Sequence, residues 1–300
     1  MSMQEKRNPN PALQARSTDR PPRRSRPLRP SRIVVALVLA VMVVVSLFPF
    51  YWNLIAAFRP LDKIFTYPPR LLPGPFTLHH FARIPAYFPH FVRNIFNSLW
   101  LATLIPMIAL LFNSMAGFAF AKLNFRGKRF LFGVVLATIL VPASSGYIPL
   151  YVEMAKLKLV DSFLAIILPG MAGAYGVFLF RQAMYAVPDE LMDAARIDGA
   201  NTLRVYATIV VPLIQPMMIT VYISGFIGTW NEYFWPFIAL KSAEKLTFPV
   251  VLTGIQGLLF EVPWGTIMVG ALILTIPTLI IFLTLSRYIV PDIFGGSVKG

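Results

Sequence analysis

Charged residues are rare along most of this chain, and the long stretches between them define its predicted elements. A helix needs about 20 mostly apolar residues to cross the hydrocarbon layer of a membrane. Six largely uncharged stretches reach that length, which predicts transmembrane helices at about residues 33–58, 94–121, 130–152, 162–182, 207–231 and 264–286. The run from Leu246 to Phe260 is shorter and contains Pro249, Gly254 and Gly257, which favours an interfacial or re-entrant piece outside the membrane.

The composition agrees with this pattern. Of the 300 residues 57% are hydrophobic and only 13% are charged, which is outside the range of an ordinary soluble domain. We therefore predict an all-α integral membrane protein with six transmembrane helices. Residues 1–32 form a separate basic segment, and residues 33–300 form the transmembrane domain, with a core at about 93–287.

Prolines lie inside several of the predicted spans, and each tends to kink its helix because it removes a backbone hydrogen bond. A bundle of kinked helices around a movable pathway explains them, and so does ordinary packing of membrane helices, where proline and glycine are common. The prolines are Pro106, Pro142, Pro149, Pro169, Pro212, Pro216 and Pro277.

Much of the formal net charge of +14 is concentrated before the first predicted span. This Pro- and Arg-rich segment has too little apolar surface to fold alone, so we predict a disordered cytoplasmic tail that meets anionic lipid headgroups. An RNA-binding arm is the alternative, but no aromatic residues are interleaved to stack on bases, so we expect no nucleic-acid partner. Its basic residues are Lys6, Arg7, Arg16, Arg20, Arg23, Arg24, Arg26, Arg29 and Arg32.

Basic residues in the short loops predict the orientation. The loop "KLNFRGKR" places Lys122, Arg126, Lys128 and Arg129 on the same side of the membrane as the basic tail. Cytoplasmic loops carry an excess of lysine and arginine. We therefore predict that both termini and this loop are cytoplasmic.

The segment from Pro188 to Tyr206, between the fourth and fifth predicted spans, is a polar exception in this chain. Pro188 suits the first turn of a helix, Asp189 and Glu190 suit its positive end, and Gly199 supplies a stop. Asn201 or Thr202 is suited to cap a second helix. Helical spacing places four residues on one low-relief face: Leu191, Ala194, Ala195 and Asp198. Such a face docks into a cleft on another protein, or it packs as an amphipathic connector on its own bundle.

A resemblance to a known family distinguishes these alternatives. The pattern Pro188-x-Glu190-Leu191-x-Asp193-Ala194-Ala195-x-Ile197-Asp198-Gly199-Ala200, with Pro212 downstream, resembles the "EAA" loop of ABC-importer permeases. Asp193 stands where that family most often has Glu, and Tyr206 where Phe is usual.

Further motifs resemble the carbohydrate-importer branch, of the maltose-permease second-subunit type, and the resemblance covers about residues 46–300. These motifs are "NSL" (97–99), "AFAKLNFRGK" (119–128), "IPLYVEMAKLKLVDS" (148–162), "WNEYFWP" (230–236) and "GSVKG" (296–300).

The resemblance implies a type-I ABC-importer permease fold with a cytoplasmic coupling helix that is seated in a groove of an ATPase subunit. Asp193 is then expected to meet a basic residue of the ATPase, while Ala194, Ala195 and Gly199 permit close approach. The terminal segment with Lys299 is also expected to lie against the ATPase. The expected coupling residues are Pro188, Glu190, Leu191, Asp193, Ala194, Ala195, Asp198, Gly199, Ala200, Tyr206 and Lys299.

Several kinds of chemistry have no matching motif. The sequence has no Gly-x-x-x-x-Gly-Lys-Ser/Thr loop, so we expect ATP and Mg²⁺ to be bound by a partner ATPase and no cofactor by this chain. The absence of cysteine excludes disulfides and thiolate metal sites. His79, His80 and His90 lie without carboxylates at ligand-like spacing, so we interpret them as surface residues and expect no metal site. With no catalytic constellation, we predict a protein that is not an enzyme.

Candidate pathway residues are few. Trp230, Asn231 and Glu232 either line the outer mouth of a pathway, where they suit a sugar, or anchor a helix at the membrane interface, which we favour. Asn113 is either a pathway group or a partner in a hydrogen bond between helices, and we favour the second.

Together these features predict a permease subunit of a bacterial ABC importer in the inner membrane, carrying a sugar or oligosaccharide by alternating access. Expected partners are a second, non-identical permease chain, two cytoplasmic ATPase subunits, an extracytoplasmic solute-binding protein and membrane lipid. A different solute such as a glycerol phosphate is the alternative within this class. A self-contained channel or secondary transporter is the alternative outside it.

Overall fold

The computed structural model describes residues 30–72, 74–258 and 262–295, and in these residues every regular element is a helix. The chain divides into two units, residues 1–49 and residues 50–300. In the first unit, the N-terminal part of helix α1 (Pro30–Ala57) is apolar, and its described side chains are exposed. Lys299 and the rest of "GSVKG" lie outside the described residues, as does most of the basic tail.

The second unit holds the end of α1 and the remaining helices of the chain. They are η2 (Leu61–Lys63), α2 (His79–Ala82), α3 (Ile84–Tyr87), α4 (Phe91–Lys122), α5 (Lys128–Ile139), η3 (Ala143–Gly146), α6 (Tyr147–Lys156), α7 (Leu164–Gly170), α8 (Ala174–Tyr185), α9 (Asp189–Ile197), α10 (Thr202–Val205), the π-helical turn η4 (Tyr206–Val210), α11 (Val211–Leu213), α12 (Gln215–Asn231), α13 (Phe234–Ala239), α14 (Phe248–Leu258) and α15 (Trp264–Gly295).

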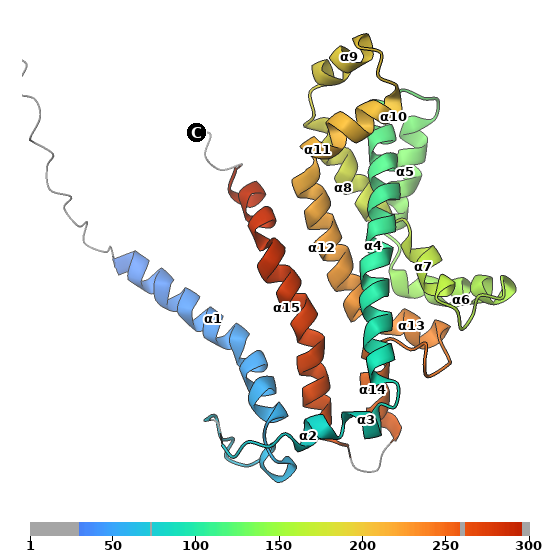
Figure 1. Cartoon of the computed structure of the whole chain (residues 1–300). Coiled ribbons are helices and arrows are strands. Elements are labelled where there is room, and N and C mark those ends of the chain that lie inside the picture. The colour runs from blue at the N-terminus through green and yellow to red at the C-terminus, as the bar shows by residue number, and fades with distance from the viewer. Residues whose placement is uncertain (1–29, 73, 259–261, 296–300) are drawn as a thin grey trace, which may run out of the picture. The chain divides into compact units, whose positions relative to one another are not determined.

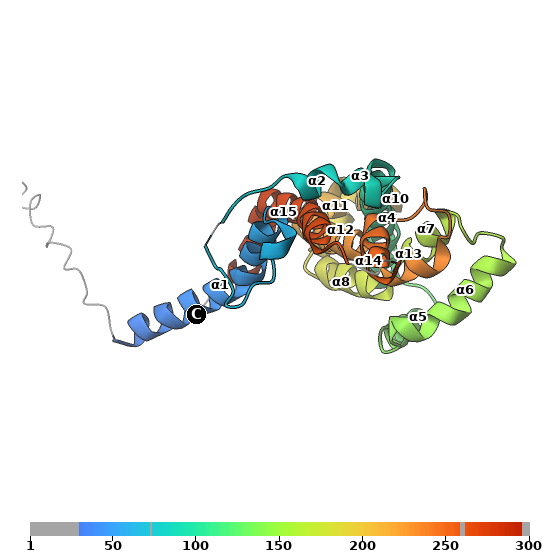
Figure 2. The ribbon, with the colours of Figure 1, turned by 90° about the horizontal axis from the view of Figure 1, so that it is seen from below.

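Within this unit α4 packs along both α8 and α12, and α12 packs along α15 (Figures 1 and 2). Glycines permit the closest approaches. A Cβ atom on Gly117 of α4 would lie 2.6 Å from the Cβ of Phe180 in α8, and one on Gly225 of α12 would lie 2.9 Å from Pro106 in α4. Small residues at such crossings let membrane helices pack by close contact. Helices α9 and α10 lie at one end of this bundle and α2, α3 and α14 at the other (Figure 1).

Four described segments are long and apolar enough to cross a membrane: Val34–Ala57, Phe91–Lys122, Leu164–Tyr185 and Trp264–Leu285. Two bent helix pairs bring the number to six when each pair counts as one span, in agreement with the predicted six-helix fold.

The bends differ from the continuous helices predicted at 130–152 and 207–231. The segments Lys128–Ile139 and Ala143–Lys156 meet at 97°, and Thr202–Leu213 and Gln215–Asn231 meet at 79°. Pro142 and Pro216 lie next to these bends, where each lacks the N–H that would continue the helical ladder. The run predicted as an interfacial or re-entrant piece contains α14, whose 11 residues are too few to span.

Candidate functional site: a coupling segment and a cavity

Helix α9 begins and ends through local sequence signals. Pro188 precedes it in an extended conformation, and Asp189 and Glu190 occupy its first turn. Gly199 ends it with a φ of +82°, a left-handed conformation that glycine adopts without steric cost. Asn201 caps α10, because its side-chain oxygen accepts a hydrogen bond of 2.9 Å from the backbone N–H of Arg204.

One face of α9 rests on its own bundle. Met192 is buried in a cluster with side chains of α8, α10 and η4, and Ala195 and Ala200 pack against that cluster. Ala195, a residue of the predicted docking face, is therefore half-buried against this cluster. The amphipathic spacing of α9 therefore places one set of side chains against the bundle and another set on the exposed surface.

The opposite face of α9 is exposed and carries apolar as well as acidic groups. Ile197 is 87% exposed, and Leu191 and Leu203 are also exposed. The predicted residues Glu190, Asp193, Ala194 and Asp198 lie on the same exposed surface. We call this surface, formed by residues 190, 191, 193, 194, 197 and 198, the α9 face; Leu203 is exposed on the following helix, α10. The sequence pattern indicated small and acidic residues as the docking groups, so it did not predict a docking role for Ile197 or Leu203.

Charged groups fix the start of α9 to the end of α4. The Nζ of Lys122 donates to the backbone carbonyl of Val187 at 2.6 Å and to the Asp189 carboxylate at 2.7 Å. Asp193, expected to meet a basic residue of an ATPase, forms an exposed ion pair of 2.9 Å with Arg196 in the same helix. Exposed pairs of this kind contribute little stability, so Asp193 stays available to a partner.

Tyr206 lies inside the bundle rather than on the α9 face. It is buried, its hydroxyl is 2.7 Å from the hydroxyl of Ser114 in α4, and its ring packs 5.4 Å from that of Phe118. The tyrosine therefore links η4, which follows α10, to α4.

A cavity of about 570 Å³ lies between α4, η3, α6, α7, α12 and α13. Its volume is in the range of ~300–1,000 Å³ that is usual for small-molecule sites. Glu232 and Thr229 line it at the end of α12, and Tyr147 and Trp235 line it from α6 and α13. The residues that line the cavity come from several helix ends and helix breaks. Irregular backbone at membrane depth is tolerated where it is buried in protein or lines a water-filled cavity.

The side chains of this wall hold one another in place. The rings of Tyr147 and Trp235 stack with their centroids 6.0 Å apart. Trp235 donates through its indole N–H to the carbonyl of Ala165 at 3.0 Å, and Glu232 accepts a hydrogen bond of 3.1 Å from the backbone N–H of Trp235. The aromatic and acidic groups therefore have fixed positions before any solute arrives.

Of the four predicted pathway residues, only Glu232 lines this cavity. Trp230 is buried and donates to the carbonyl of Leu274 in α15 at 2.9 Å. Asn231 is exposed and donates back to its own helix. Asn113 is buried, and its side-chain oxygen accepts a hydrogen bond of 2.9 Å from the backbone N–H of Gly173, between α7 and α8. This contact joins helices, which was the interpretation favoured for Asn113.

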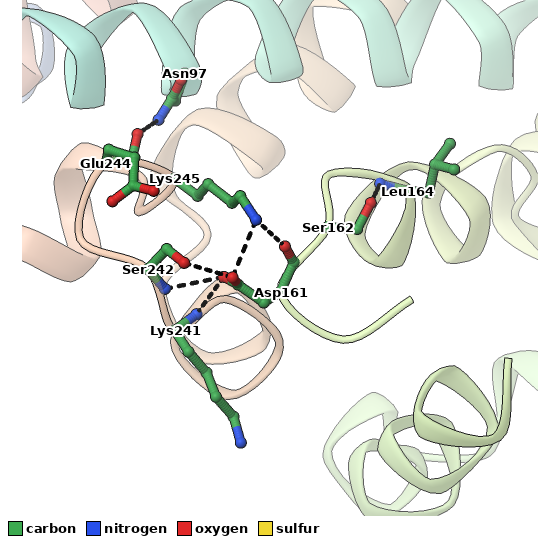
Figure 3. Close-up of polar contacts among 8 residues, drawn as sticks. All are labelled: Asn97, Asp161, Ser162, Leu164, Lys241, Ser242, Glu244 and Lys245. Carbon is green, nitrogen blue, oxygen red and sulfur yellow. Dashed lines mark hydrogen bonds and ion pairs between the residues drawn. The ribbon is translucent and has the colours of Figure 1, made fainter. Parts of the chain in front are cut away.

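A polar clamp supports the loop that follows α13 (Figure 3). Asp161 accepts hydrogen bonds from the backbone N–H groups of Lys241 and Ser242, both at 2.9 Å, and from the Ser242 hydroxyl at 2.5 Å. The Lys245 ammonium lies 3.0 Å from the same carboxylate. The Ser242 hydroxyl, together with the N–H groups of Ser242 and Lys241, holds the pKa of Asp161 well below its usual range, and Lys245 adds to this effect.

Helix α4 holds the same loop from its other side. The amide of Asn97 donates to the carbonyls of Glu244 and Leu246 at 2.9 and 3.1 Å, and the hydroxyl of Ser98 accepts from the N–H of Phe248 at 2.7 Å. The motifs "NSL" and "VDS" therefore meet at one loop. Sequence reasoning missed this role, because the two motifs are far apart in the chain.

The expected surface histidines differ from one another. His79 and His90 are exposed, but His80 is buried, and its Nε2 lies 2.7 Å from the carbonyl of Arg59. The interpretation of all three as surface residues is therefore wrong for His80, which connects α2 to the backbone at Arg59. Among the described residues no group of three His, Asp or Glu side chains is placed to hold a metal ion.

Comparison with known proteins gives the class. Residues 113–295 match the binding-protein-dependent transport system inner membrane component family. A solved structure titled as a bacterial ABC transporter involved in the import of the acidic polysaccharide alginate matches with a TM-score of 0.76 and 24% identity, over 85% of this chain and 95% of that one. The fold is thus that of an ABC-importer permease, a multi-pass membrane protein. The chain belongs to the family of binding-protein-dependent inner membrane components.

Curated relatives cover nearly the whole chain. The arabinooligosaccharides transport system permease protein of Halalkalibacterium halodurans is 32% identical over 89% of this chain and 96% of its own length. The lactose transport system permease protein of Rhizobium radiobacter is 32% identical over the same shares. The sn-glycerol-3-phosphate transport system permease protein of Escherichia coli is 30% identical over 84% of this chain and 91% of its own length.

Proposed function

We propose that this chain is the membrane-spanning permease subunit of an ATP-driven importer for a sugar or oligosaccharide. A solute-binding protein delivers the solute, and ATP hydrolysis is supplied in trans by two cytoplasmic ATPase subunits. ATP closes the ATPase dimer, α9 transmits that motion to the spans, and the pathway opens alternately to each side. The α9 end of the bundle and both termini are cytoplasmic in this proposal, with the basic tail at the lipid surface.

The observation that carries the coupling role is the α9 face. Ile197 and Leu191 expose apolar side chains on the same face of α9 as Asp193 and Asp198, and Leu203 exposes another on α10. Contiguous apolar surface rimmed by charge is characteristic of a protein interaction site. Met192 and Ala195 hold the other face of the same helix on the bundle, so a displacement of α9 reaches α4 and α8 directly.

A second permease chain is expected to complete the pathway. Helix α5 exposes Phe130, Val134 and Ile139, and the apolar side chains of α1 in residues 34–48 are exposed as well. We infer that a related, non-identical chain covers part of this apolar surface and that lipid covers the rest. Close packing, rather than hydrophobic burial, drives helix association in lipid.

The proposal of a sugar rests on relatives that transport arabinooligosaccharides and lactose. sn-Glycerol 3-phosphate is the second candidate, because a 30% identical relative transports it. The cavity's composition, discussed below, favours the sugar.

The test is reconstitution in lipid vesicles with the second permease, the ATPase and the binding protein encoded beside it. We expect uptake of a neutral oligosaccharide only when all components and ATP are present. Vesicles without the ATPase are the control. Uptake in those vesicles would contradict the proposal and indicate a self-contained channel or secondary transporter.

A further inference from the structure

The wall of the cavity described above contains one charged side chain. Among the described residues that line it, Glu232 is the only acidic or basic one. Glu232 forms no ion pair with any described residue, and its hydrogen bond is accepted from the N–H of Trp235. A carboxylate in such a wall accepts hydrogen bonds from hydroxyl groups and repels anions.

Thr247 adds an unused polar group to the same wall. Its side chain is 5% exposed, and its hydroxyl is buried without a hydrogen-bond partner in the structure. A buried hydroxyl without a partner is unfavourable by about 1–3 kcal/mol, so native proteins seldom retain one. Rotation of the Thr247 side chain toward the cavity would let a solute hydroxyl supply the missing partner.

Gly228 keeps the cavity open. It lies inside α12, where glycine is less favourable than alanine by about 1 kcal/mol. Unlike Gly225 one turn earlier, it makes no close approach, because a Cβ atom at Gly228 would meet nothing within 4 Å. Helix packing therefore does not require glycine at this position, whereas a larger side chain would occupy cavity space.

The remaining groups suit a sugar ring. The stacked rings of Tyr147 and Trp235 form an aromatic surface in the wall, which Ser98 and Thr229 also line. A mostly apolar pocket with a few fixed polar groups is the general form of a small-molecule site.

We propose that this cavity binds one ring of an uncharged polyhydroxylated solute within this subunit, with Glu232 and Thr247 as hydrogen-bond partners and Tyr147 and Trp235 as the apolar wall. The proposal rests on the proposed function and makes it more specific. The subunit itself selects neutral sugars, and it disfavours phosphate esters and sugar acids through the Glu232 carboxylate.

The absence of cysteine in this chain permits a direct test. Gly228→Cys is introduced into the full-length chain in the assembled transporter, and its labelling by a cationic and an anionic methanethiosulfonate of similar size is followed by mass spectrometry. We expect the Glu232 carboxylate to raise the rate of the cationic reagent about fivefold relative to that of the anionic reagent. One carboxylate near the thiol in a water-filled cavity has an electrostatic effect of this size. Glu232→Gln should remove this preference. The ratio of the two rates cancels the reactivity of the thiol itself.

Gly254→Cys in α14 is the matched control, because Gly254 also has open space around its Cβ position but does not line the cavity. Its labelling ratio should not respond to Glu232→Gln. Neutral mono- to trisaccharides, lactose among them, should slow labelling of Gly228→Cys, and sn-glycerol 3-phosphate should not. A ratio of the two rates that Glu232→Gln leaves unchanged, protection by the phosphate ester, or no protection by any neutral sugar would overturn the proposal.

A second variant tests the space. Gly228→Leu should lower ATP-dependent uptake about tenfold, because its side chain fills part of a cavity that must admit the solute. Gly254→Leu should transport like the wild type, and both variants should still co-purify with the ATPase. Normal uptake by Gly228→Leu would contradict the proposed cavity. Failure of the wild-type transporter to show ATP-dependent uptake would instead contradict the proposed function, while the labelling test still reports on the cavity.

Discussion

The ammonium of Lys122 lies 2.7 Å from the carboxylate of Asp189, although the lysine side chain is 6% exposed and the aspartate side chain is 72% exposed. The pair joins the end of α4 to the start of α9, and the same ammonium donates to the carbonyl of Val187. A buried cation at this point fixes α9 relative to α4.

The asymmetry of this pair predicts unequal effects of removing each partner. Lys122→Met should destabilise the chain more than Asp189→Asn, because it also leaves the Val187 carbonyl without its donor, whereas the exposed end of the pair is worth at most ~1 kcal/mol. Thermal unfolding in detergent measures both variants. An equal or larger loss in Asp189→Asn would contradict this assignment.

Substitutions on the two faces of α9 should have different effects. Those on the packed face should lower stability, and those on the exposed face should leave stability almost unchanged. Met192→Ala should lower the free energy of unfolding by about 2–4 kcal/mol, because the buried side chain leaves a cavity. Ile197→Ala should change it by less than about 0.5 kcal/mol, since its side chain is exposed. Denaturant unfolding of the purified chain measures the difference. Similar losses in both variants would show that Ile197 is packed on the bundle.

The contact between Ser114 and Tyr206 should behave as one interaction. Tyr206→Phe and Ser114→Ala each remove the same hydrogen bond of 2.7 Å, and each should cost about 1 kcal/mol. The double variant should cost less than the sum of the single variants. Additive losses would show that the two hydroxyls do not depend on one another.

The clamp at Asp161 predicts a defined pH dependence. The pKa of Asp161 is lowered in the folded protein, so its contribution to stability is present above the unfolded pKa of about 3.9 and is lost as the pH falls through the folded pKa. Asp161→Asn should therefore lower the melting temperature equally at neutral and mildly acidic pH. The gap to the wild type should narrow only at more acidic pH, below about pH 4. Melting curves over this range measure it, and a gap that closes at mildly acidic pH would contradict the clamp.

The sequence predicts the helices of this fold better than their breaks. Apolar runs mark the spans because lipid demands about 20 apolar residues from any crossing helix. Pro106 and Pro277 lie within continuous helices, whereas Pro142 and Pro216 lie beside sharp bends. Local composition does not distinguish these cases. A proline leaves one backbone carbonyl of its helix without a hydrogen-bond donor, and contacts with neighbouring helices decide whether the helix continues through that point or breaks.

The candidate site shows the same division. The roles of Gly199 and Asn201 can be predicted from the local sequence, because a left-handed residue that ends a helix and a residue that caps one depend only on adjacent backbone. The burial of Met192 and Tyr206 depends on contacts with α8 and α4, which are distant in sequence. Glu232 was recognised as an unusual ionisable residue, but the cavity around it forms only when the helix ends meet.

Ile197→Asp tests whether the α9 face docks an ATPase, because it places a charge in the middle of the exposed surface. Leu72→Asp is the matched control, because Leu72 is 78% exposed and lies in a loop distant from α9. A side chain introduced at Gly199 would test the docking surface less cleanly, because it would also strain a backbone with positive φ.

The measurement is co-purification of the ATPase subunit with this chain, together with ATP hydrolysis stimulated by the loaded binding protein. We expect Ile197→Asp to lose both, whereas Leu72→Asp should retain the bound ATPase. Retention of the ATPase and of stimulated hydrolysis by Ile197→Asp would contradict this docking role.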